Sequence, residues 1–166
     1  ATAEHFRKAG EGGNADGCVN YGRALALGLG VEQDEPRGVG FYRRGCDGGS
    51  GAGCFNVAHR LEHGKGGLEK DASQAAALYA KSCELGDADG CVNSGRAYGL
   101  GLGVAKDDQR AVALYEKACS QGSGVGCSNL AVRLQSGLGI AKDAARATAM
   151  FRRSCELGYA EACKSK

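Results

Sequence analysis

The sequence predicts an all-α protein, a right-handed α/α solenoid of helix–turn–helix repeats. Three observations point to this fold class. The 166-residue chain repeats itself every 36 or 37 residues, it is rich in glycine (29) and cysteine (9), and each copy carries the same helix-boundary signals. Two short helices per copy cannot each bury an apolar face alone, so neighbouring copies must stack.

The cysteines define the period. Segments starting at Cys18, Cys54, Cys91 and Cys127 read CVNYGRALALGLGVEQD, CFNVAHRLEHGKGGLEKD, CVNSGRAYGLGLGVAKD and CSNLAVRLQSGLGIAKD. The second has one extra loop residue near Gly66 and Gly67. We therefore expect one solenoid domain with the following parts: the end of a preceding helix and a turn (1–17), four repeats (18–53, 54–90, 91–126 and 127–162), and the truncated start of a further helix (163–166).

The first helix of each repeat, helix A, is predicted to begin near the Cys-x-Asn sequence and to run for about ten residues. Cys18, Gly22 and Leu25 then lie at i, i+4 and i+7 on one face. A glycine follows each helix A, in the place where a left-handed residue closes a helix. These glycines are Gly28, Gly64, Gly101 and Gly137.

The second helix, helix B, is predicted to start at an aspartate that accepts hydrogen bonds from the first free backbone N–H groups. The four aspartates are Asp34, Asp71, Asp107 and Asp143. Pro36 falls in the first turn, where its missing N–H costs nothing. Each helix B carries one aromatic residue that we expect to pack between repeats: Tyr42, Tyr79, Tyr115 or Phe151.

The loop between the two helices carries a family resemblance. Gly28-Leu29-Gly30-Val31, Gly101-Leu102-Gly103-Val104 and Gly137-Leu138-Gly139-Ile140, each followed by its aspartate, resemble Sel1-like repeats, which are relatives of the tetratricopeptide repeats. The match covers nearly the whole chain. The added cysteine pair in each repeat is similar to the bacterial subset typified by the Helicobacter cysteine-rich proteins, and this resemblance implies a secreted or periplasmic protein.

The paired cysteines are expected to form disulfides. The first cysteine of a pair ends helix B and the second starts the next helix A, across a glycine-bearing turn that brings the two alpha carbons within disulfide range. Each bridge contributes about 2.5 kcal/mol in the chain-entropy model. The expected pairs are Cys46–Cys54, Cys83–Cys91, Cys119–Cys127 and Cys155–Cys163. Reduced core thiols are an alternative, and metal binding is a weaker one because zinc prefers closer Cys spacing.

Disulfides require an oxidising compartment, so a periplasmic or secreted location is predicted. Cys18 is the odd cysteine, since Gly10 stands where its partner would be. We expect a buried unpaired thiol, with pairing between chains as the alternative. A dimer through Cys18 or through the ends of the array, which show no obvious polar cap, is also compatible with the sequence.

Charge and hydropathy exclude some partners. A formal net charge of +2 lacks the basic excess that nucleic-acid binding requires. No apolar run approaches the roughly 18 residues of a membrane span. We therefore expect neither nucleic acid nor a membrane span among this chain's interactions.

One asparagine recurs at the same helix A position in every repeat. Asparagine is unfavourable inside helices, so its recurrence needs a reason. Each amide could brace the turn between repeats, or a row of amides could bind the backbone of an extended peptide. The candidate binding residues are Asn20 and Arg23, Asn56 with His59 and His63, Asn93 with Arg96, and Asn129 with Arg133. Such a face suits a protein or peptide with acidic groups or a free carboxylate.

Catalytic and metal chemistry have weaker support. The family resemblance suggests binding or hydrolysis of β-lactams or peptidoglycan fragments, but no serine has lysine three residues later, as a serine β-lactamase needs. His59 and His63 lie at i and i+4 and could share a metal, yet no third ligand is identifiable. We expect a non-catalytic binding scaffold without a cofactor or metal.

Overall fold

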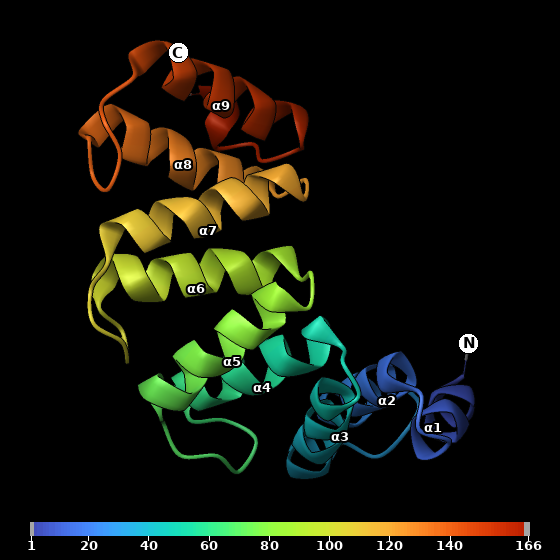
Figure 1. Cartoon of the computed structure of the whole chain (residues 1–166). Coiled ribbons are helices and arrows are strands. Elements are labelled where there is room, and N and C mark those ends of the chain that lie inside the picture. Colours follow the sequence, from blue (N-terminus) through green and yellow to red (C-terminus); the bar gives the residue numbers. More distant parts are fainter. Residues whose placement is uncertain (1, 165–166) are drawn as a thin grey trace. The chain divides into compact units, whose positions relative to one another are not determined.

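Nine α-helices and one short 3₁₀ helix make up residues 2–164, the part of the chain that the computed structural model describes (Figure 1). The helices are α1 (Ala3–Glu11), α2 (Ala15–Leu27), α3 (Glu35–Asp47), α4 (Gly51–His63), α5 (Ala72–Glu84), α6 (Ala88–Leu100), α7 (Asp108–Ser120), α8 (Gly124–Ser136), α9 (Ala144–Glu156) and η1 (Ala162–Lys164). No strand occurs in residues 2–164. The all-α solenoid of two-helix repeats is confirmed.

The chain forms two compact units, Ala1–Gly90 and Cys91–Lys166. In the first unit, α1 packs on α2, α2 on α3, α3 on α4 and α4 on α5. In the second, α7 packs on α8 and α8 on α9 (Figure 1). Within residues 2–164 no helix combines the length and the hydrophobicity that crossing a bilayer requires.

Helix B begins as predicted. The carboxylate of the aspartate before α3, α5, α7 and α9 accepts a hydrogen bond from the backbone N–H three residues later, over 2.8–3.0 Å. Such a cap stabilises a helix by about 1 kcal/mol. Pro36 lies in the first turn of α3, also as predicted.

Helix A begins earlier than predicted. α2, α4, α6 and α8 each start three residues before their cysteine rather than near it. The reason is a second set of helix caps: Asn14 accepts from Gly17 N at 2.7 Å, and Ser123 accepts from Gly126 N at 3.1 Å. The opposite ends agree with the prediction, since Gly28 and Gly137 close α2 and α8 with left-handed φ angles of 69° and 73°.

Each unit buries its own apolar cluster. In the first, the aromatic rings of Tyr42 and Tyr79 pack with Val57 and Leu61. In the second, Tyr115 packs with Leu130 and Leu134 in the same arrangement. The predicted packing role of the helix B tyrosines is thereby confirmed.

A glycine allows helix B to approach the next helix A closely. A Cβ added to Gly53 would lie 2.5 Å from the backbone nitrogen of Cys46 and 2.8 Å from the carbonyl oxygen of Tyr42. At the equivalent place in the second unit, a Cβ on Gly126 would lie 2.6 Å from Cβ of Ala118. Any larger residue before the second cysteine would therefore push the two helices apart.

This approach brings the paired cysteines within bonding distance. The Cα–Cα separations are 4.5 Å in Cys46–Cys54, 4.5 Å in Cys119–Cys127 and 4.8 Å in Cys155–Cys163, within the range for disulfides. Cys83 and Cys91 are also disulfide-bonded, which gives one bridge per repeat. Cys18 is buried and unpaired, as expected, and its Sγ donates to the carbonyl oxygen of Gly10 at 3.1 Å.

Removing one bridge should lower stability measurably. The double variant Cys119→Ala/Cys127→Ala is expected to lose about 2–3 kcal/mol of unfolding free energy in urea titrations, because its unfolded chain is less constrained. Cys18→Ala is the control, with an expected loss of about 1 kcal/mol or less, since it removes only one buried sulfur atom. Equal losses in the two variants would contradict the proposed role of the bridge.

The position of Gly10 should accept a fifth bridge. Gly10 lies eight residues before Cys18, and a Cβ built on it would be 3.1 Å from the Cys18 alpha carbon. We expect Gly10→Cys to pair with Cys18 and to add about 2.5 kcal/mol of stability. Mass spectrometry after alkylation under denaturing, non-reducing conditions should find no reactive thiol, whereas Gly10→Ser keeps one. Two reactive thiols in Gly10→Cys would refute the geometric equivalence of this junction.

Candidate functional site

The recurring asparagines lie on a stripe of helix A that is partly open to solvent. In the first unit, α2 contributes Asn20, Arg23 and Leu27, which are all exposed. On α4 the equivalent residues are Asn56 and His59, which are half-buried, and the exposed His63. Because α2 and α4 contact each other, the two stripes lie on neighbouring helices of this unit.

The second unit repeats the pattern with different chemistry. On α6, Asn93 and Arg96 are half-buried and Leu100 is 64% exposed. On α8, Asn129 is half-buried while Val132 is 50% exposed. We refer to these residues of α2, α4, α6 and α8 as the helix A stripe of each unit.

The asparagine amides differ in their hydrogen bonds. Asn56 is held by its own helix, since its Nδ2 donates to the carbonyl oxygen of Ala52 at 2.8 Å and its Oδ1 accepts from Arg60 at 3.1 Å. Among residues 2–164, the side chains of Asn20 and Asn129 make no such bond. The structural explanation of the repeated asparagine therefore applies to Asn56, while the exposed Asn20 and the half-buried Asn129 have amides that make no hydrogen bond within the fold.

Arg133 lies beside the stripe rather than on it. It stands six residues after its cysteine, whereas Arg23 and Arg96 stand five residues after theirs. Its side chain is only 12% exposed and forms an ion pair of 2.5 Å with Asp108. The guanidinium also lies 5.9 Å from the ring centre of Tyr115.

The first unit contains the same arrangement. Arg60 is 14% exposed, pairs with Glu35 at 3.5 Å and lies 4.8 Å from the ring centre of Tyr42. In both units an arginine of helix A thus joins the start of the preceding helix B to its tyrosine. The residue type alone does not distinguish these bracing arginines from those of the stripe. Counting from the cysteine does separate the two kinds of arginine.

The electrostatics of this junction favour the ion pair. Burial opposes ionisation of Asp108, but hydrogen bonds from Arg133 and Lys106 outweigh it and hold the pKa of Asp108 below its ordinary value. Asp108 is therefore a carboxylate at neutral pH. The contact braces two consecutive repeats of the second unit.

His59 and His63 lie side by side on α4. Their ring centres are 4.3 Å apart with an angle of 32° between the planes, and Phe55 stacks on the far side of His59 at 6.3 Å. Burial, the adjacent His63 and the positive charge of Arg60 lower the pKa of His59. In the described part of the chain, no three His, Cys, Asp or Glu residues gather as a group that could hold a metal.

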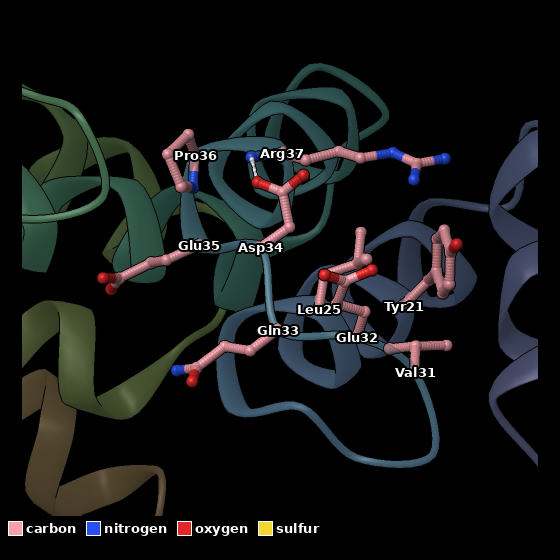
Figure 2. Close-up of a pocket in the computed structure, with 9 residues that line it drawn as sticks. All are labelled: Tyr21, Leu25, Val31, Glu32, Gln33, Asp34, Glu35, Pro36 and Arg37. Carbon is pink, nitrogen blue, oxygen red and sulfur yellow. Dashed lines mark hydrogen bonds between the residues drawn. The ribbon is translucent and has the colours of Figure 1, made fainter.

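A pocket of about 690 Å³ opens at the loop between α2 and α3, which sequence reasoning did not anticipate (Figure 2). Its lining residues are Tyr21, Leu25, Val31, Glu32, Gln33, Asp34, Glu35, Pro36 and Arg37. Two of its carboxylates are already engaged, since Asp34 caps α3 and Glu35 pairs with Arg60. The side chains of Gln33 and Glu35 extend to the side opposite Arg37 (Figure 2), so the polar groups do not converge on one point.

Comparison with solved structures supports the fold. A Sel1 repeat protein from Oxalobacter formigenes is 28% identical, with a TM-score of 0.87 over 98% of this chain and 64% of its own. A protective antigen of uropathogenic Escherichia coli is 27% identical, with a TM-score of 0.86 over 95% of this chain and 33% of its own. The chain therefore spans less than two thirds of either protein.

A cysteine-rich relative is also found. Helicobacter pylori cysteine-rich protein B is 27% identical, with a TM-score of 0.63 over 78% of this chain and 92% of its own. No curated protein matches the chain. The Sel1 repeat model matches residues 15–50, 51–87, 88–123 and 124–159, and these four copies cover most of the sequence. The chain belongs to the Sel1 repeat family.

Proposed function

We propose that this chain is a non-catalytic scaffold that binds an extended peptide or protein segment along its helix A stripes, in the periplasm or the extracellular space. The observation that carries the proposal is a pair of amides without a hydrogen bond inside the fold, those of the exposed Asn20 and the half-buried Asn129, at a helix position where asparagine gives the fold no visible benefit. An amide offers both a donor and an acceptor, which is what the backbone of an extended peptide requires.

The neighbouring residues favour an acidic or carboxylate-bearing segment. The exposed guanidinium of Arg23 lies one helical turn from Asn20 and can form charge-assisted hydrogen bonds with a carboxylate. Leu27, 55% exposed, continues the same stripe and offers apolar area. In the second unit Val132 supplies apolar area next to Asn129, so the stripe of each unit offers both polar and apolar groups.

The disulfides support the proposed location. Four bridges in one small chain persist in an oxidising compartment and are rare in a reducing cytosol. A periplasmic or secreted binding protein also gains from covalent bracing, because its stripes keep their geometry without a ligand.

The amides of Asn20 and Asn129 should matter for binding and not for folding. An array of random octapeptides with free carboxyl termini should yield binders, and fluorescence anisotropy on the tightest should show at least tenfold weaker affinity for Asn20→Ala and Asn129→Ala. Their melting temperatures should match the wild type, since neither amide is bonded within the fold. Asn56→Ala is the matched control, with an expected loss of about 1 kcal/mol of stability.

The proposal is refuted if Asn20→Ala and Asn129→Ala bind the peptide as tightly as Asn56→Ala does. It is also refuted if the melting temperature of Asn20→Ala falls as far as that of Asn56→Ala. Comparing the array with an amidated copy tests the carboxylate. A preference for the free carboxylate that disappears in Arg23→Ala would assign that role to Arg23.

The two kinds of arginine should behave in opposite ways. Arg133→Ala should lower the unfolding free energy by about 2 kcal/mol, because it leaves Asp108 without its main partner. Arg23→Ala should change it by about 0.5 kcal/mol or less, as expected of an exposed side chain. Urea titrations of both variants measure the two unfolding free energies. A larger loss of unfolding free energy in Arg23→Ala than in Arg133→Ala would contradict the structural role of Arg133.

A further inference from the structure

The two imidazoles of α4 lie close enough to share one ion. Zinc–imidazole bonds are about 2.0–2.1 Å long, so two nitrogens on one ion lie at most about 4.2 Å apart. The ring centres of His59 and His63 are 4.3 Å apart, and their planes differ by 32°. Both rings thus lie on one face of α4, near enough for one nitrogen of each to be turned toward a common point.

The hydrogen bond of His63 leaves its Nε2 available to bind a metal ion. Its Nδ1 lies 2.8 Å from the carbonyl oxygen of His59. A carbonyl only accepts, so Nδ1 carries the proton, and Nε2 of the neutral ring keeps its lone pair. Imidazoles that bind metals are typically fixed by such a bond from their other nitrogen.

The ring of His59 is held by its neighbours. It is half-buried and stacks on Phe55. A ring that is already held in place loses less conformational freedom when an ion binds to it.

We infer that His59 and His63 form a two-nitrogen site for a late first-row divalent cation, with Ni²⁺, Cu²⁺ and Zn²⁺ as the class that imidazole pairs favour. The coordination positions that the two rings leave open are filled by water or by a donor from outside the chain. The site lies on the helix A stripe of the first unit, but its existence does not depend on peptide binding.

Calorimetry with NiCl₂ at pH 7.5 tests the inference on the whole chain. One Ni²⁺ should bind per molecule, and His59→Gln and His63→Gln should each weaken binding at least tenfold. The only other histidine, His5 on α1, provides the matched control, and His5→Gln should bind as the wild type does. Circular dichroism should show unchanged helix content in all three variants, because His63 and His5 are exposed and His59 is only half-buried.

Introducing the same histidine pair into the second unit gives a test that looks for a gain of binding, so a loss of folding cannot mimic the expected result. Val132 and Ser136 occupy on α8 the positions of His59 and His63 on α4, and both are exposed. The double variant Val132→His/Ser136→His should bind a second Ni²⁺ with an affinity within tenfold of the first. Its matched control, Val132→His alone, should bind one.

Three results would overturn the inference. These are wild-type affinity in both His59→Gln and His63→Gln, loss of binding in His5→Gln, or no heat of binding at millimolar Ni²⁺ in the folded wild type. Nuclear magnetic resonance with Zn²⁺ locates the ligands directly. A shift of the ring ¹⁵N signals of His59 and His63, with His5 unchanged, is the expected result.

Discussion

The close crossing between the end of each helix B and the start of the next helix A is the constraint on which the fold depends. Glycine before the second cysteine removes the Cβ that would separate the helices, as Gly53 does against Cys46 and Gly126 against Ala118. The disulfide then fixes the crossing covalently. Glycine alone would leave a poorly held junction, and cysteine alone could not reach its partner. The glycine before the second cysteine and the cysteine pair therefore act together at each crossing.

Much of this could be predicted from the sequence, because the signals are local. The aspartate caps of helix B, the left-handed glycines after helix A and the eight-residue cysteine spacing each act within a few residues. The start of helix A was predicted too late because Asn14 and Ser123 stand within glycine-rich segments that read as turns. The local pattern does not show whether such a residue caps a helix or lies in a longer turn.

The candidate site was harder to predict because it depends on contacts between repeats. Arg133 has the same residue type as Arg23 and Arg96, but a shift of one helix position turns it by about 100° toward Asp108 of the preceding helix B. Asn56 looks like Asn20 in the sequence, yet Arg60 binds its amide. The neighbour that decides each role lies in another part of the chain or one turn away, and residue type alone does not identify it.

The junction contacts also show that the repeats alternate in type. Arg60 with Glu35 and Tyr42 in the first unit correspond, two repeats later, to Arg133 with Asp108 and Tyr115 in the second.

Buried serine hydroxyls show the same alternation between repeats. Ser82 donates to the carbonyl oxygen of Gly51 at 2.9 Å, and Ser154 donates to that of Gly124 at 2.6 Å. Gly45 and Ala118 occupy the position of these serines in the other two repeats, and neither has a side-chain donor. The structural unit that recurs is therefore a pair of repeats, braced inside by one arginine and one serine.

This alternation separates the residues that hold the fold from those that are left for recognition. The braced positions keep their chemistry in both pairs: arginine, acid, tyrosine and serine recur with the same partners. The helix A stripe changes its chemistry between the pairs, since His59 and His63 of the first pair correspond to Val132 and Ser136 of the second. A surface that varies on a constant frame can change its ligand without changing its packing. Specificity in this chain is therefore expected to lie in the stripe residues that follow each asparagine.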